Sequence, residues 1–161
     1  MNDFDKAYRQ HLEGLWGKVG FIVNLSQMIE YNLANILAFD EILGEFDDRN
    51  SMSLLDYNTF ATRADNLYNK LSKHSFGYGL RQAKEVNFFT NDSYKWLQKI
   101  CKERNYIIHH IFKDDLKLKH IESDPKYYFE RLETLIEEMY LANEDLCKIF
   151  KQQKAMFKLI W

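Results

Sequence analysis

Residues 12–36 read LEGLWGKVGFIVNLSQMIEYNLANI, and this stretch decides the fold. Its apolar residues recur at alternating steps of three and four, with a serine at one step. The positions are Leu12, Leu15, Val19, Ile22, Ser26, Ile29, Leu33 and Ile36. An α-helix turns once in about 3.6 residues, so these side chains share one face. The pattern predicts one long helix over residues 4–46 whose apolar stripe other helices must cover.

Three glycines lie within this helix at a spacing of three, namely Gly14, Gly17 and Gly20. Each lowers helix stability by about 1 kcal/mol relative to alanine. A row of residues without side chains lets a second backbone come close, so we expect close packing there.

The rest of the chain also carries helical patterns. Ser75 to Gly79 is expected to interrupt them, and the segment from Asp114 to Ser123 is expected to connect two helices. Thr90 to Ser93 is typical of a turn with a helix N-cap, while Asp124 followed by Pro125 is typical of a helix start. The expected helices span 54–73, a short segment ending near 88, 94–113, and 126 to near the C-terminus.

Composition agrees with this pattern. The chain has 161 residues, 46% of them hydrophobic, with one Pro and six Gly. So few breakers favour long helices over a turn-rich β fold. We expect a single all-α domain over residues 1–161, an up-and-down bundle of four to five helices.

Several classes of protein are disfavoured. Cys101 and Cys147 are far apart and form no Cys-x-x-Cys pair, so neither a zinc site nor a disulfide framework is expected. No cofactor or metal motif occurs. The N-terminus is polar and no apolar run approaches the roughly 20 residues of a membrane span. These features predict a cytoplasmic protein that does not enter membranes, without cofactor or metal.

One charged residue sits where an apolar one is expected. In the helix 94–113, Arg104 lies at the centre of a face whose other members, Leu97, Cys101, Ile108 and Ile111, are spaced by three and four. A buried arginine is costly unless it is paired or presented to a partner. One interpretation pairs it with an interior carboxylate, Glu30 or Glu41. The other presents it to a substrate.

Two histidines follow. On an ideal helix His109 lies about 140° from Arg104, and His110 about 120° in the other direction. Neither therefore stacks on the arginine within one straight helix. Asn105 shares the face of His109 and could orient its ring. A site that uses both the arginine and a histidine needs a second copy of the helix, a distorted helix end or a long reach of the arginine.

The segment Lys102-Glu103-Arg104-Asn105-Tyr106-Ile107-Ile108-His109-His110 resembles the signature of the HEPN superfamily, in which an Arg precedes a His by four to six intervening residues. Arg104 with His109 fits the shortest spacing, and Asn105 matches the polar residue often found after the Arg. The resemblance covers fewer than ten residues, within a helical bundle of the expected order.

The resemblance implies a homodimer whose motif helices line a shared cleft. It implies a metal-independent endoribonuclease, with Arg104 holding the scissile phosphate and His109 acting as base or acid at a ribose 2′-OH. It also implies a toxin or phage-defence effector, held in check by a cognate antitoxin protein. Asn105, His110 and Glu30 are the expected supporting residues. A HEPN-like module that binds RNA, nucleotide or protein without catalysis is the alternative.

The net charge is −2, so any attraction for RNA must be local. Lys113, Lys117 and Lys119 follow the motif and are candidate RNA contacts. The C-terminal helix carries lysines at 148, 151, 154 and 158 along one face. A solvated helix face is the preferred interpretation of that second group.

Overall fold

The computed structural model describes residues 3–47, 57–86, 88–111, 113 and 123–160. Within these residues the chain forms five α-helices and no strand. The helices are α1 (Asp3–Asp47), α2 (Tyr57–Leu71), α3 (Phe76–Ala83), α4 (Asn91–His110) and α6 (Pro125–Ile160). The prediction of an all-α bundle of four to five helices is confirmed for this part of the chain.

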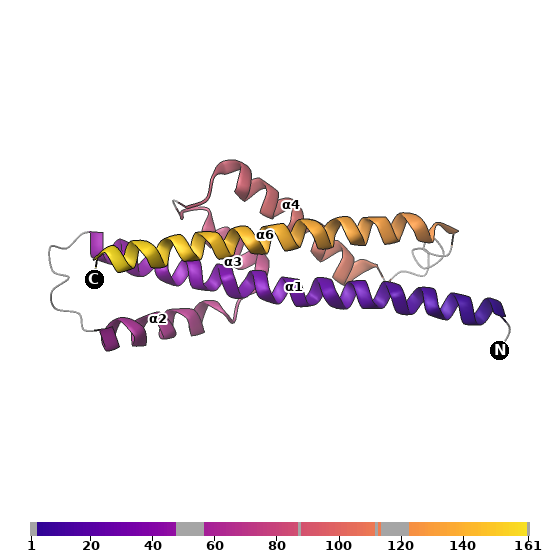
Figure 1. The fold of residues 1–161 in the computed structure, drawn as a ribbon, viewed down its shortest axis with the longest axis horizontal. Coiled ribbons are helices and arrows are strands. Elements are labelled where there is room, and N and C mark those ends of the chain that lie inside the picture. The colour runs from indigo at the N-terminus through magenta and orange to yellow at the C-terminus, as the bar shows by residue number, and fades with distance from the viewer. Residues whose placement is uncertain (1–2, 48–56, 87, 112, 114–122, 161) are drawn as a thin grey trace.

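The first and last helices form the long axis of the molecule and lie side by side (Figure 1). Their contacts advance together along the two sequences. Lys18 Nζ lies 2.8 Å from Glu133 Oε1, and Asn32 Nδ2 donates to Asn143 Oδ1 at 2.8 Å. The two helices are therefore parallel. In an up-and-down bundle, helices that follow one another in the sequence pack antiparallel. Here the most extensive packing instead joins the first and the last helix of the chain.

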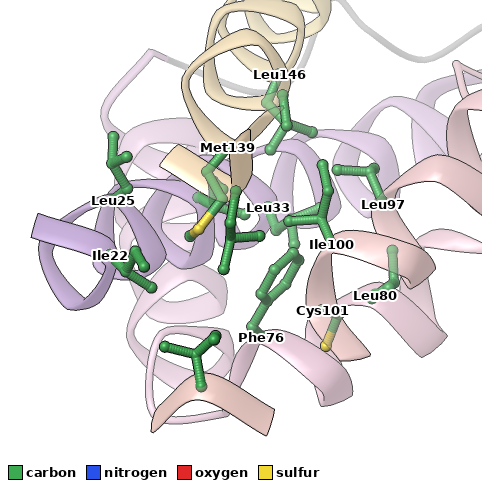
Figure 2. Packing of buried hydrophobic residues seen from close by; sticks show 14 of the residues in the cluster. Ile22, Leu25, Leu33, Phe76, Leu80, Leu97, Ile100, Cys101, Met139 and Leu146 are labelled. Carbon is green, nitrogen blue, oxygen red and sulfur yellow. The ribbon is translucent and has the colours of Figure 1, made fainter. Parts of the chain in front are cut away.

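The core is drawn from four helices. Figure 2 shows Phe76 pointing into a cluster between α1, α4 and α6. Phe76 has no exposed surface, and neither do Ile22, Ile29 and Ile100. Other labelled members are Leu25, Leu33, Leu80, Leu97, Cys101, Met139 and Leu146. The stripe predicted from residues 12–36 is the face of α1 that enters this cluster.

The expected interruption between two helices is observed, but it lies earlier than expected, between Leu71 and Phe76. Ser75 is the N-cap of α3, the segment from Phe76 to Gly79 is its start, and the helix ends at Ala83 rather than near Phe88. The helix forms because Phe76 is fully buried and its backbone N–H donates to Glu30 Oε1 at 2.8 Å. Gly79 in the same turn faces Leu33, whose side chain would lie 3.7 Å from an added Cβ. Tertiary contact here outweighs the weak helix propensity of glycine.

Two helix starts follow from side-chain caps. Thr90 Oγ1 accepts from the backbone N–H of Ser93 at 3.1 Å, so α4 begins at Asn91, three residues before the expected Tyr94. Asp124 Oδ1 accepts from the backbone N–H of Tyr127 at 3.1 Å, and α6 begins at Pro125. Both caps satisfy donors that a helix leaves unpaired at its N-terminus.

The expected close packing at the three glycines of α1 is only partly observed. A Cβ on Gly14 would lie 3.0 Å from the ring of Phe129, whereas nothing lies within 4 Å of one on Gly17 or Gly20. The neighbour at Gly14 is an aromatic side chain, not a second backbone. Gly17 and Gly20 instead face outward on α1.

The hydrogen bond between Asn32 and Asn143 generates the first prediction. Both residues are buried, so Asn143→Leu leaves the Asn32 amide short of a partner and lowers the free energy of unfolding by about 1–3 kcal/mol. The double change Asn32→Leu/Asn143→Leu removes both polar groups and recovers most of that loss. Urea denaturation measures both, with the exposed Asn24→Leu as control. A double variant no more stable than the single one contradicts the expectation.

Candidate functional site

Arg104 lies where α4 crosses α1 and is held by three side chains. Its Nε donates to Ser26 Oγ at 2.9 Å and its Nη1 to Asn105 Oδ1 at 2.9 Å. Its Nη2 lies 3.5 Å from Glu30 Oε1, and the Arg104 side chain is 16% exposed. Ser26 is itself aligned, because its hydroxyl donates to the Ile22 carbonyl at 2.7 Å. The arginine is thus paired within the single chain, and part of its side chain still reaches the surface.

Glu30 joins three helices at this point. The same oxygen that faces Arg104 of α4 accepts the backbone N–H of Phe76 at the start of α3. Glu30 belongs to α1, so one carboxylate links all three. Of the two carboxylates considered from the sequence, Glu30 is the partner of Arg104, whereas Glu41 is exposed. The contact between Arg104 and Glu30 therefore supports the interpretation of Arg104 as a structural ion.

The two histidines lie near the last turn of α4. His109 and His110 are both exposed, and the geometry expected from the helical wheel holds, since neither joins the hydrogen bonds of Arg104 among the described residues. The prediction that Asn105 orients His109 is wrong in the single chain. The Asn105 amide accepts from Arg104 and donates to Cys101 Sγ at 3.8 Å. The guanidinium next to it is the stronger donor and draws the amide to its own side.

His110 belongs to a layered group that the sequence did not reveal. Its ring stacks on the ring of Tyr106 with centroids 5.8 Å apart. The Arg131 guanidinium lies over the same Tyr106 ring, 4.5 Å from its centroid. Arg131 is bonded to Glu103, which raises the pKa of its guanidinium. The Tyr106–His110 spacing of four could have been recognised as one helix face. Nothing in the sequence points to Arg131, which comes from α6.

The thiol next to the arginine is buried in the core. Cys101 is 7% exposed, and burial raises the pKa of its thiol, although the nearby Arg104 charge and the Asn105 bond act in the opposite sense. Less thiolate means a weaker nucleophile. Cys101 is thus a free thiol in the core, and Cys147, which is partly buried, is likewise free of a disulfide.

Of the three lysines expected to contact RNA, one lies within the described residues. Lys113 is exposed beyond the end of α4, whereas Lys117 and Lys119 lie outside the described residues. On the C-terminal helix, Lys148 Nζ lies 2.8 Å from Asp145, and Lys154 Nζ lies 4.2 Å from the centroid of the Phe150 ring. These contacts are those of a solvated helix face.

Comparisons with known proteins give no family. No family model matches the chain, and it has no match among the curated proteins or the solved structures. Among the described residues, no three His, Cys, Asp or Glu side chains gather closely enough to hold a metal ion. None of the described helices combines the length and apolar character that a membrane span requires.

The position of Glu30 generates the second prediction. Glu30→Ala leaves Arg104 without its acid and the buried Phe76 N–H without its acceptor, so the free energy of unfolding falls by about 3 kcal/mol. The partly exposed pair of Lys18 and Glu133 serves as control, because Glu133→Ala costs no more than about 1 kcal/mol. Thermal and urea denaturation of both variants test this. Equal losses for the two variants exclude a structural role of Glu30 at the helix crossing.

Proposed function

We propose that this chain is a metal-independent endoribonuclease of HEPN type that works as a homodimer, with Arg104 and His109 catalytic. The observation that carries the proposal is the Arg104-to-His109 motif on α4 of an all-helical bundle, with both histidines exposed near the end of that helix. Glu30, Asn105 and His110 support the site.

The roles follow from the contacts around each group. Arg104 is aligned by Ser26, Asn105 and Glu30, which engage three of its five N–H groups. Two N–H groups are left for a phosphate oxygen, and the side chain is 16% exposed. A guanidinium held in place by its neighbours needs no reorganisation when negative charge develops on the phosphate. An exposed imidazole can exchange protons near neutral pH.

The reaction moves one proton at each end. The imidazole of His109 takes the proton of a ribose 2′-OH, and the 2′-oxygen bonds to the adjacent phosphorus. The bond from phosphorus to the 5′-oxygen breaks, and that oxygen receives a proton from a second imidazole, either His110 or the same histidine of a second copy. The products carry a 2′,3′-cyclic phosphate and a 5′-hydroxyl. Arg104 stabilises the charge on the phosphate oxygens.

A second copy answers the separation of the two groups on α4. Within one copy Arg104 faces α1 while His109 is exposed on another side of α4. In the proposed dimer, His109 of each copy lies next to Arg104 of the other. The outer face of α1 supports self-association. Between Gly14 and Ile29 its only charged residue is Lys18, and it exposes four large apolar side chains: Trp16 at 56%, Phe21 at 46%, Val23 at 37% and Met28 at 44%. Lys18 is paired with Glu133, so copies of this face meet across a two-fold axis with little like-charge repulsion.

The biological setting proposed with this activity is that of a cytoplasmic toxin or phage-defence effector with a cognate antitoxin protein. Uninhibited cleavage of RNA harms the cell that makes the enzyme. An inhibitor would therefore have to cover the histidines or prevent formation of the dimer. Support for this setting comes only from the motif on α4.

A second function is favoured by one observation. Arg104 is bonded to Ser26 and Glu30 in the manner of a structural ion, which a HEPN-like module without catalysis would retain. Such a module binds RNA, nucleotide or protein at the same surface and cleaves nothing. The two functions differ in what a histidine substitution does.

The third prediction concerns catalysis. His109→Ala abolishes cleavage of a single-stranded RNA while the thermal unfolding temperature stays unchanged, because this side chain is exposed. Arg104→Lys keeps a charge next to Glu30 but loses the planar fork, and it lowers cleavage at least about tenfold. Activity persists in EDTA. Gel analysis of labelled RNA and detection of the cyclic phosphate are the measurements, with exposed Gln152→Ala as control. Wild-type protein that binds RNA without cleaving it supports the binding module instead.

The fourth prediction concerns the dimer. If each site takes its arginine from one copy and its histidine from the other, a mixture of Arg104→Lys and His109→Ala regains cleavage. Random exchange gives half mixed dimers with one intact site of two, or about a quarter of wild-type activity. The measurement is cleavage after the variants are mixed and equilibrated, alongside light scattering. Mixed dimers without recovered cleavage contradict a site shared between copies.

A further inference from the structure

A groove lies between α4 and α6, on a different side of α4 from Arg104. It has a volume of about 700 Å³ and is lined on the α4 side by Lys95, Lys99 and Lys102. The α6 side contributes Tyr127 and Arg131. The two helices are antiparallel here, since Lys99 pairs with Glu138 at 2.8 Å while Glu103, one turn later, bonds Arg131, earlier in α6.

The lysines continue into the histidines along one line of α4. Lys95, Lys99, Lys102, Tyr106 and His109 follow one another at steps of three or four. His110 is the next residue, and Lys113 lies three residues further, beyond the end of α4. On an α-helix all of them lie within about 60° of a common line. The distance from Lys95 to His110 along the axis is about 22 Å, which spans several nucleotides. All seven are exposed except Tyr106, which is partly buried.

The charge balance leaves two lysines available. Each acidic residue of the groove has a basic partner: Glu138 pairs with Lys99, Glu103 with Arg131, and Glu130 with Lys126 at 3.7 Å. Among the described residues, Lys95 and Lys102 have no such partner. They stand about two helical turns apart on the open side of the groove, a spacing that suits successive phosphates of a flexible strand better than one small anion.

Aromatic rings lie in the same groove. Tyr127 is 53% exposed at its α6 wall. The stacked rings of Tyr106 and His110 lie next to the groove, where the Arg131 guanidinium that lines it lies over Tyr106. Unstacked bases pack on such rings, and a paired duplex keeps its bases inside. The combination of spaced cations with aromatic rings favours a single strand.

We propose that the α4/α6 groove binds single-stranded RNA, with Lys95 and Lys102 on its phosphates and Tyr127 under a base, and leads the strand to His109 and His110. The inference rests on the proposed ribonuclease function and names its substrate class and entry path. It also explains how a chain with net charge −2 attracts RNA, since the positive charge is concentrated on one face of one helix.

The test compares two doubly substituted proteins with the same net charge. Lys95→Gln/Lys102→Gln removes the two available groove lysines, and Lys84→Gln/Lys151→Gln removes two exposed lysines elsewhere. The probe is a short single-stranded RNA with 2′-O-methyl riboses, which cannot undergo 2′-attack. Fluorescence anisotropy at several salt concentrations gives the dissociation constant and its salt dependence for each protein.

The groove variant binds at least about tenfold more weakly than wild type, and the slope of log affinity against log salt becomes shallower by about 1.4, the share of two phosphates on a single strand. The control pair changes neither by a comparable amount. Tyr127→Leu weakens binding without changing the slope. A duplex of the same sequence competes poorly.

The outcomes separate this inference from the proposed activity. Binding that depends on Lys95 and Lys102, together with no cleavage of the unmodified RNA, supports the groove and defeats the nuclease. Cleavage that is intact in the groove variant, with affinity equal to the control pair, defeats the groove and leaves the nuclease standing. Absence of RNA binding by the wild type, or equal competition by the duplex, also overturns the groove.

Discussion

The carboxylate of Glu30 is the contact on which the arrangement of the helices most depends. It lies on α1, accepts the first backbone N–H of α3 and faces the guanidinium of Arg104 on α4. Three elements from distant parts of the chain therefore meet at one acid. An unpaired arginine in this position would be costly, because most of its surface is withdrawn from water. The pairing allows α4 to cross α1 with a charge in its apolar face.

The same contact bears on function. A residue proposed to hold a phosphate is also part of the packing between helices, so stability and chemistry share Arg104. This arrangement is compatible with catalysis, since a positioned cation stabilises developing charge without moving. It is equally compatible with a purely structural ion. The exposed histidines, of which His110 stacks on Tyr106, are what distinguish the two.

Helix α4 has two faces with different chemistry. One face buries Leu97, Ile100 and Ile107 against the core and carries Arg104 to α1. The other is exposed and carries lysines and imidazoles beside the groove with α6. A ligand in that groove would lie on a different side of α4 from Arg104, whereas the proposed reaction needs both the ligand and the arginine. A second copy is the simplest way to bring the two faces together.

The sequence by itself determined the helical class, the long first helix and the start of the last helix. These features depend on local repeats and caps: the spacing of apolar residues in 12–36, and Asp124 before Pro125. It also placed Arg104 in an apolar face with Glu30 as a possible partner, because the cost of an unpaired buried charge leaves few choices. The start of helix α3 could not be predicted in this way, because its glycines disfavour a helix. The burial of Phe76 and the hydrogen bond from its backbone N–H to Glu30 stabilise the helix there. Only the tertiary structure decided that α1 and α6 run parallel, that Asn105 turns to Arg104 rather than His109, and that Arg131 lies over Tyr106. Each of these depends on side chains brought together from distant positions, and no local pattern encodes which distant partner arrives.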